Sequence, residues 1–285
     1  MPSRRSEKDM ADISKDLFGP FAGIGALDLP NTRLVDPFDG ILGVFYTKIV
    51  NQAEQDNAWF AEQAVPSGPG RVLDLCCGGG RSAVELARAG HEVTAVDISP
   101  IQLAAAQKRA AEFGVTDRMT FVYADVTTLD LDQVFDAVVI GGLSVTLFDG
   151  EARTALLRAV TRHLAPGGRL LFDHAPAQPD EQESEKVFTV PIRMRERSGF
   201  VLVGMLRRPA DRTQFTNMSA ELTDGEGRTT RHLTGFRFWI DSTESVTAKL
   251  GRHGLTVTAA HRDPEARDTA SPATMREFIV AEALR

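Results

Sequence analysis

The segment at residues 71–81, RVLDLCCGGGR, limits what this chain can fold into more than any other part of its sequence. The apolar run from Val72 to Leu75 is typical of a buried parallel strand, and residues 81–89 carry small and apolar side chains at helical spacing. Three glycines between them let the backbone adopt positive φ and pass close to a bound molecule, and the N–H groups at a helix start favour a negatively charged ligand group. The segment therefore predicts a strand, a glycine turn and a helix, with a ligand bound at the turn.

Two carboxylates lie at the ends of predicted strands. Asp74 interrupts the apolar end of the first strand, where a carboxylate is costly unless it meets hydrogen-bond donors or a cation. Residues 91–97 form the second predicted strand, which ends at Asp97, and Ser99 caps the next helix with Pro100 at its first position. One carboxylate can accept hydrogen bonds from both hydroxyls of a ribose, so Asp97 predicts a ligand that contains this sugar.

Strand and helix patterns alternate as far as residue 175. Apolar strands are predicted at 119–123 and 135–140, a helix at 150–164, and a further strand at 169–172 after a Leu-x-Pro-Gly-Gly sequence. Such alternation is typical of a parallel sheet that is covered by helices and binds ligands at the carboxyl ends of its strands. The chain is therefore predicted to be an α/β protein.

The segment Val-Leu-Asp-Leu-Cys-Cys-Gly-Gly-Gly resembles the first motif of the class I S-adenosylmethionine (SAM)-dependent methyltransferases, usually Val-Leu-Asp-Leu-Gly-Cys-Gly-Thr-Gly. Residues 70–175 resemble this family in the order, spacing and chemistry of its motifs. The resemblance implies a Rossmann-like, doubly wound, seven-stranded sheet with an antiparallel last strand, and SAM as the cofactor. Cys76 replaces the first glycine of the motif and puts a side chain where the backbone approaches the amino acid end of SAM.

By this resemblance, a set of residues along the carboxyl edge of the sheet would bind the cofactor. Ile98 would lie against the adenine, Asp125 would accept from the adenine amino group, and the N–H of Val126 would meet a ring nitrogen. A turn-forming role is the alternative for Asp125. The full set of implied cofactor residues is Asp74, Cys76, Gly78, Gly80, Arg81, Asp97, Ile98, Asp125, Val126 and Gly141.

A nicotinamide dinucleotide is the rival cofactor. The spacing of Gly78, Gly80 and Ala83 also fits the G-x-G-x-x-A fingerprint of dinucleotide sites, and Asp97 follows at a distance suited to a ribose contact. Asp74 favours SAM, because its carboxylate suits the ammonium and sulfonium side of that molecule.

Two regions lie outside the predicted SAM-binding core of residues 70–175 and 241–285. Residues 1–69 are expected to form a polar, mobile arm as far as about residue 35, followed by helices, which resemble the helical lid over the cofactor in this family. Residues 176–240 alternate apolar and polar side chains between turn sequences, which predicts an inserted antiparallel β meander. In the resembled family such an insert roofs the substrate and can build a homodimer contact. The predicted core is completed by a helix and two strands at 241–254, 255–262 and 277–284.

The acceptor site is predicted where the fourth and fifth strands end. His174 lies just beyond the fifth strand and is the best placed general base; a structural histidine bonded to Asp173 or to the backbone is the alternative. Tyr46, from the predicted lid, is a candidate for catalysis or substrate contact, and its alternative is a core tyrosine. The predicted substrate contacts are Tyr46, Leu143, Ser144, Phe236, Phe238 and Trp239.

N-methylation is the reaction that these features favour. The combination of lid, core and insert resembles small-molecule N-methyltransferases, such as the amino-sugar N,N-dimethyltransferases and the glycine type. It resembles more faintly the daptide-type methyltransferases of ribosomal peptide pathways. We therefore expect methyl transfer to an amine of a small molecule or a peptide terminus in natural product biosynthesis. The alternatives are O- or C-methylation of a small acid or phenol, and a SAM-binding module without catalytic activity.

Composition bears on partners and location. The net charge of −7 argues against a general nucleic-acid-binding protein, and no apolar run approaches the length of a membrane span. The first residues lack an apolar signal core, so a cytoplasmic protein is expected. The two cysteines, Cys76 and Cys77, are adjacent, and no cluster of histidines and carboxylates at ligand spacing predicts a metal site.

Overall fold

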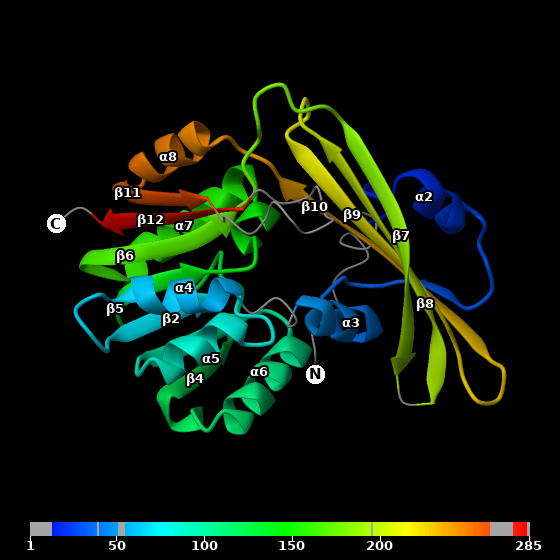
Figure 1. Cartoon of the computed structure of the whole chain (residues 1–285), viewed down its shortest axis with the longest axis horizontal. Coiled ribbons are helices and arrows are strands. Elements are labelled where there is room, and N and C mark those ends of the chain that lie inside the picture. The colour runs from blue at the N-terminus through cyan, green and yellow to red at the C-terminus, as the bar shows by residue number, and fades with distance from the viewer. Residues whose placement is uncertain (1–12, 39, 51–54, 195, 263–275, 284–285) are drawn as a thin grey trace. The chain divides into compact units, whose positions relative to one another are not determined.

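The computed structural model describes residues 13–38, 40–50, 55–194, 196–262 and 276–283. Contacts divide the chain into two compact units (Figure 1). The core unit comprises residues 47–178 and 240–285, and the insert unit comprises residues 1–46 and 179–239. Each unit contains one β-sheet.

The core unit is built on a seven-stranded sheet with the order β11-β12-β6-β5-β2-β3-β4. The strands from β2 to β6 run parallel to one another, whereas β12 is antiparallel to both β6 and β11. This topology confirms the predicted Rossmann-like sheet with an antiparallel last strand. Its strands are β2 (Arg71–Leu75), β3 (Glu92–Asp97), β4 (Met119–Tyr123), β5 (Phe135–Ile140), β6 (Leu164–His174), β11 (Leu255–Arg262) and β12 (Glu277–Ala283).

The strand β6 begins at Leu164, earlier than the predicted start at Arg169. Leu164 already pairs with Phe135 of β5, and the register then shifts before Ala137 pairs with Arg169. The Pro-Gly-Gly sequence between the two pairs forms an irregularity within the strand. The sequence pattern indicated a turn there because proline and glycine usually mark one.

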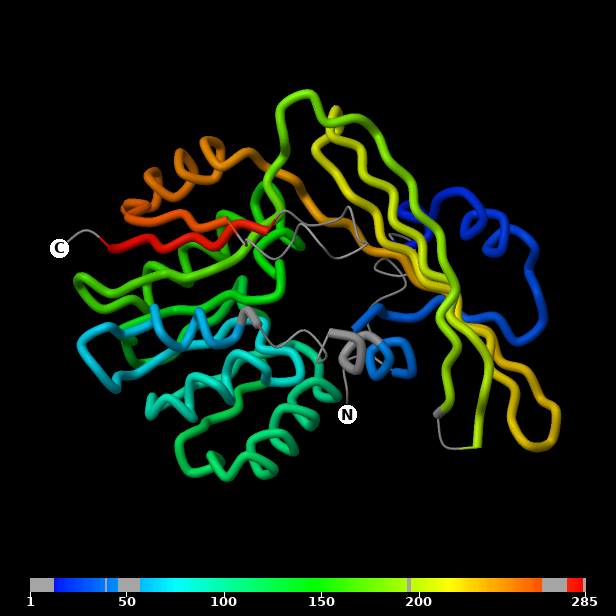
Figure 2. The backbone as a smooth tube through the Cα atoms, viewed as in Figure 1, coloured from blue at the N-terminus to red at the C-terminus, as the bar shows by residue number. Residues whose placement is uncertain are grey.

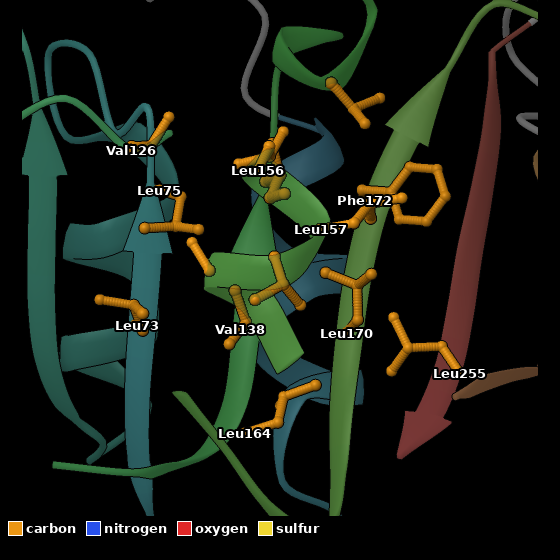
Figure 3. Packing of buried hydrophobic residues seen from close by; sticks show 14 of the residues in the cluster. Leu73, Leu75, Val126, Val138, Leu156, Leu157, Leu164, Leu170, Phe172 and Leu255 are labelled. Carbon is orange, nitrogen blue, oxygen red and sulfur yellow. The ribbon is translucent and has the colours of Figure 1, made fainter. Parts of the chain in front are cut away.

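Helices cover both faces of this sheet. α4 (Gln55–Ala64), α5 (Arg81–Arg88) and α6 (Pro100–Glu112) lie on one face, and α7 (Gly150–His163) and α8 (Thr243–Gly251) lie on the other. Val72 and Leu171 belong to the apolar cluster beneath α4 and α5, whereas Leu73 and Leu170 belong to the cluster beneath α7 (Figure 3). Because side chains of a strand alternate between faces, the two clusters also show to which face each polar residue at a strand end points.

The insert unit is built on a five-stranded sheet with the order β1-β10-β9-β8-β7. β7 to β10 form the predicted antiparallel meander, and β1 adds a parallel strand beside β10. Its strands are β1 (Thr32–Leu34), β7 (Ser184–Met194), β8 (Arg197–Arg208), β9 (Thr213–Thr223) and β10 (Thr229–Trp239).

The described part of the predicted N-terminal arm is folded against this sheet. α2 (Gly19–Ala26) follows Phe18, and the ring of Phe21 in this helix is fully buried. Gly204 of β8 makes room for it, because a side chain at that position would collide with the Phe21 ring. The N–H of Phe18 also donates to Oδ1 of Asn217 at 3.0 Å. The sequence offered only sparse apolar anchors in the arm, and the surface that receives them lies almost two hundred residues later. A further helix, α3 (Gly40–Val50), follows β1.

The chain passes between the units after residue 46 and at two further points that neighbour each other. It leaves the core unit after residue 178 and returns at residue 240 (Figure 2). The N–H of Ala177 donates to the carbonyl oxygen of Asp241 at 3.0 Å. Asp241 is buried, and its carboxylate pairs with Arg153 of α7 and with Lys249 of α8. The two crossing segments are therefore held together by residues of the core unit.

Candidate cofactor and acceptor site

Asp74 lies in β2, one residue before the strand ends, and its side chain is fully buried. The hydroxyl of Ser82, in the first turn of α5, donates to Oδ2 of Asp74 at 2.8 Å. The other carboxylate oxygen, Oδ1, has no hydrogen-bond partner. Burial raises the pKa of Asp74 to about 7, although the Ser82 hydrogen bond acts in the opposite direction. A cationic ligand group at Oδ1 would stabilise the ionised form and satisfy the orphan oxygen.

The turn after β2 requires left-handed backbone at three positions. Cys76, Gly78 and Gly80 have φ values of 57°, 52° and 78°. Gly80 also allows close packing, because a Cβ there would lie 2.8 Å from Cβ of Ala106 in α6. Cys76 occupies the left-handed region with a side chain, which costs about 1–2 kcal/mol relative to glycine. Burial raises the pKa of the Cys76 thiol well above its ordinary range, so the thiol is protonated at neutral pH and is a poor nucleophile.

Asp97, at the end of β3, is tied to this turn. The N–H of Gly78 donates to Oδ2 of Asp97 at 2.8 Å, and the N–H of Ser99 donates to Oδ1 at 2.8 Å. Each carboxylate oxygen can accept a second hydrogen bond, as contact with a ribose diol requires. The next residue, Ile98, is 55% exposed, which is unusual for a side chain of its size and apolar character.

Asp125 follows β4 and is exposed. Its Oδ1 accepts from the N–H of Thr127 at 2.8 Å and from the Thr127 hydroxyl at 2.7 Å. The turn-forming role that the sequence left open is therefore present in the structure, and the adenine contact stays a prediction. The side chain of Val126 is 5% exposed and belongs to the core cluster, so only its backbone is placed to meet a ligand.

The loop after β5 brings the predicted acceptor residues next to this site. A Cβ at Gly141 would lie 3.6 Å from the Ser82 hydroxyl that binds Asp74. Leu143 has a φ of 61°, and its N–H donates to Oδ2 of Asp173 at 2.9 Å. The hydroxyl of Ser144 donates to the carbonyl oxygen of Gly141 at 2.7 Å. Leu143 and Ser144 thus stand at the same edge of the sheet as the predicted cofactor residues.

Arg81, the first residue of α5, also reaches this loop. Its Nη2 would lie 3.7 Å from a Cβ at Gly142, and its charge favours the ionised form of Asp74. The structure thereby brings together the ends of β2, β3 and β5, as predicted.

His174 ends β6 with 2% of its surface exposed. Its Nε2 lies 3.2 Å from Oε2 of Glu277, the residue paired with it across β12. Thr243 of α8 also donates to this glutamate oxygen. Burial lowers the pKa of His174, although Glu277 acts in the opposite direction. The partner of Nε2 is therefore Glu277 rather than Asp173 or the backbone, and the role of His174 as a base stays a prediction.

The remaining predicted substrate residues belong to the insert unit. The rings of Phe236 and Phe238 pack edge to face at 5.2 Å on one face of β10. The guanidinium of Arg237 lies 5.2 Å from the Trp239 ring on the opposite face, so the three aromatic residues do not form one surface. Tyr46 lies in α3, and its side chain is outside the described residues.

Sequence reasoning missed three residues of this site. Ser82 and Asp173 are buried, and Arg276 binds Asp173 with Nε at 3.0 Å and Nη2 at 2.6 Å. Asp173 carried the same signal as Asp74, a carboxylate at the end of an apolar strand. Arg276 had no signal of its own, because it lies 103 residues from its partner.

The residues at the ends of β2 and β3 fit SAM. Its ammonium suits the orphan Oδ1 of Asp74, its ribose diol suits Asp97, and its adenine suits the exposed side chain of Ile98. A dinucleotide would also use Asp97, but Asp74 has no comparable partner in it. In the described part of the chain, no group of three or more histidine, cysteine or carboxylate side chains is placed to bind a metal ion. None of the helices that the structure describes is both long and apolar enough to span a bilayer.

Residues 72–168 match the protein family described as methyltransferase domain. A cypemycin N-terminal methyltransferase from Streptomyces sp is 39% identical over 103 residues, which are 36% of this chain and 40% of that protein. The demethylmenaquinone methyltransferase of Mycobacterium tuberculosis is 36% identical over 151 residues, which are 51% of this chain and 60% of that protein. The chain therefore spans 60% or less of the length of these two relatives.

Solved structures match over most of the chain. The sugar N-methyltransferase KedS8 from Streptoalloteichus sp has a TM-score of 0.69 at 19% identity, and the match covers 89% of this chain and 96% of that one. The glycopeptide N-methyltransferase MtfA, complexed with S-adenosylhomocysteine (SAH), has a TM-score of 0.58 at 25% identity, with 94% and 99% covered. Residues 72–168 therefore form a methyltransferase domain, and the chain has the fold of class I SAM-dependent methyltransferases.

Proposed function

We propose that this chain transfers a methyl group from SAM to an amine of a small molecule or a peptide terminus in specialised metabolism. The observation that carries the cofactor part is Asp74, a buried carboxylate with one orphan oxygen at the glycine turn of a methyltransferase domain. An oxygen in this state needs a donor or a cation, and the SAM ammonium is both.

The main task of the protein is to position SAM and the acceptor, because SAM carries a methyl group that is already activated for displacement by a nucleophile. Asp74 and Asp97 would hold the amino acid and ribose parts of SAM. Leu143 and Ser144 would border the methyl group from the end of β5. Alignment of the two reactants can lower the barrier by several kcal/mol without any covalent step on the protein.

Nitrogen is the acceptor atom that the comparisons favour. KedS8 is a sugar N-methyltransferase, MtfA is a glycopeptide N-methyltransferase, and the cypemycin enzyme is an N-terminal methyltransferase. Two of these resemble the chain over nearly its whole length, including the region of the insert sheet. The contacts of Phe236, Phe238 and Tyr46 with the acceptor stay a prediction.

His174 is the proposed proton acceptor, acting through a water rather than in direct contact, because its side chain points to the sheet face opposite Asp74. A bound ammonium has no lone pair until it loses a proton, so an N-methyltransferase needs a base or a supply of neutral amine. The lowered pKa of His174 keeps its imidazole neutral at pH 7, and Glu277 is placed to stabilise the protonated form.

Methylation of carbon or oxygen is the second candidate. One relative is a demethylmenaquinone methyltransferase, and its match covers more of this chain than the cypemycin match does. That match covers 51% of this chain, and enzymes with different acceptors share a cofactor-binding core.

Methyl-labelled SAM tests the proposal. The purified protein is incubated with trideuteromethyl-SAM and an extract of the source cells, and new labelled masses are fragmented to locate the label. We expect one or two labelled methyl groups on one nitrogen. Label found only on carbon or oxygen would contradict N-methylation and support the second candidate. The absence of transfer to any molecule would contradict a methyltransferase activity.

A further inference from the structure

Asp173, at the end of β6, is a second buried carboxylate with one unused oxygen. Its side chain is completely buried. Oδ2 accepts three hydrogen bonds, from the N–H of Leu143 at 2.9 Å and from Nε and Nη2 of Arg276 at 3.0 and 2.6 Å. Oδ1 accepts none and is shielded from water. All the donors that the described residues supply to Asp173 therefore converge on one of its two oxygens.

Asp173 and Asp74 point to the same face of the core sheet. Leu171 and Val72, each two residues earlier in the same strand, both belong to the apolar cluster beneath α4 and α5. Since the side-chain period of a strand is two, Asp173 and Asp74 continue toward that face. The strand β5 lies between β2 and β6, so the two carboxylates flank its end, where the Gly141 loop begins.

His174 points to the other face. Phe172, two residues earlier, belongs to the cluster beneath α7 and α8, and the His174 ring contacts Glu277 and approaches Phe172 at 6.1 Å between ring centres. At the carboxyl end of β6, the polar group on the Asp74 side of the sheet is therefore the carboxylate of Asp173.

Among the residues that the structure describes, none offers a further partner for Oδ1 of Asp173. Phe278 of β12 pairs with Asp173 in register, the Phe60 ring of α4 lies 5.8 Å from the Phe278 ring, and the Arg276 guanidinium lies over Phe278 at 5.3 Å. Buried acceptors in proteins are nearly always hydrogen-bonded, and one left at the ligand-binding edge of an open α/β sheet points to a bound donor.

We propose that Oδ1 of Asp173 accepts a hydrogen bond from an N–H of the acceptor amine and thereby selects amines over acids and phenolates. The proposal rests on the proposed methyltransferase function and adds the residue that recognises the acceptor. A carboxylate or phenolate acceptor would offer no donor and would be repelled by the aspartate charge. A primary amine and its monomethyl product both retain an N–H for this contact, whereas a neutral dimethylamine does not. Asp173 would therefore permit two transfers to a primary amine and disfavour a third.

The test is a binding measurement on the SAH-loaded protein. Asp173→Asn keeps the shape and an oxygen for Leu143 and Arg276, and it presents an NH2 group at the position of Oδ1. Benzylamine is titrated calorimetrically at saturating SAH, with benzyl alcohol and benzoate as probes of the same shape. We expect the wild type to prefer benzylamine to benzoate at least tenfold and Asp173→Asn to weaken benzylamine binding about tenfold or more, with SAH affinity changed less than twofold.

Two controls separate recognition from a structural role. Asp149→Asn makes the same change at an exposed carboxylate that caps no N–H of α7, and benzylamine affinity should not change. Arg276→Lys weakens the pairing at Oδ2 but leaves Oδ1, so benzylamine binding should fall less than threefold. Equal losses in Asp173→Asn and Arg276→Lys would reduce Asp173 to a structural partner of Arg276.

Other outcomes also decide the matter. SAH binding without benzylamine preference in the wild type overturns the proposal and leaves the methyltransferase function standing; this comparison needs no variant, so it holds even if Asp173→Asn fails to fold. Failure of SAH to bind the wild type overturns the proposed function itself.

Discussion

The cofactor half and the acceptor half of the site are built in different ways. At the ends of β2 and β3, Ser82 binds Asp74 from 8 residues away and Gly78 binds Asp97 from 19 residues away. At the ends of β5 and β6, Asp173 is held by Leu143 and Arg276, 30 and 103 residues away. The first half is a local assembly that one motif encodes. The second half depends on Arg276, directly before β12, which lies 103 residues after Asp173. The residues of the acceptor half can therefore change without altering the cofactor motif.

The largest expected effect is a loss of turnover on mutation of the acceptor half, with the cofactor affinity unchanged. Replacing His174 with glutamine removes the proposed base, so turnover at saturating amine should fall about a hundredfold at pH 7. Affinity for SAH should stay within a factor of about two, because no cofactor residue contacts the ring. Steady-state kinetics and calorimetry measure the two quantities. Full turnover with a lowered melting temperature would assign His174 a structural role and leave the methyltransferase standing.

The next effect belongs to the cofactor half. Asp97→Ala removes the acceptor of two backbone N–H groups and of the proposed ribose contacts, so SAM binding should weaken by about 1–3 kcal/mol. Circular dichroism should show an intact fold. Asp125→Ala is the comparison variant, because the Asp125 carboxylate already binds Thr127 in a local turn. SAM binding should weaken less in this variant than in Asp97→Ala. If calorimetry gave Asp97→Ala the affinity of the wild type, the end of β3 would not be the ribose site.

The pH dependence of SAH affinity should show whether Asp74 binds the ammonium group. The folded pKa of Asp74 is raised from 3.8 to about 7, so below about pH 7 the carboxyl is protonated and the ammonium of SAM must displace a proton. Affinity for SAH should therefore rise about tenfold per unit between about pH 5 and pH 7 and then level off. The same shift removes stability from the unliganded protein as pH rises from about 4 to about 7. In Asp74→Asn both dependences should be flat, and a wild-type affinity without this slope would mean that the ammonium binds elsewhere.

The smallest effect concerns the departure from the family motif. Cys76→Gly relieves a left-handed side chain, whereas Cys76→Ala removes the thiol and keeps the strain. The glycine variant should be more stable than the alanine variant by about 1 kcal/mol in urea unfolding. Equal stabilities would show that the backbone at residue 76 is not strained.

Much of the core unit could be predicted from the sequence, because its signals are local. A buried parallel strand such as β2 is a short apolar run, and its glycine turn and helix follow within ten residues. The ends of β3 and β5 were located in the same way, and so were Asp97 and Gly141. The antiparallel insert followed from alternation and turn sequences alone.

Contacts between distant segments could not be predicted. Nothing near Phe21 indicates that Gly204 will receive its ring, and nothing near β6 indicates that Glu277 rather than Asp173 will bind His174. The face to which a polar side chain at a strand end points depends on register, and a shift of one residue exchanges the faces. Phe238 and Trp239 illustrate this, since neighbouring residues in β10 serve opposite faces.

Ligand-dependent unfolding tests the central claim, a SAM site at the glycine turn, most directly. A ligand present at a hundred times its dissociation constant stabilises the folded state by about 2.7 kcal/mol, which a thermal melt detects readily. SAM and SAH should each raise the melting temperature of the wild type, and both shifts should shrink in Asp97→Ala. NAD at the same concentration should produce no shift. A shift of the melting temperature with NAD alone would contradict this claim and would show that the glycine turn binds a dinucleotide.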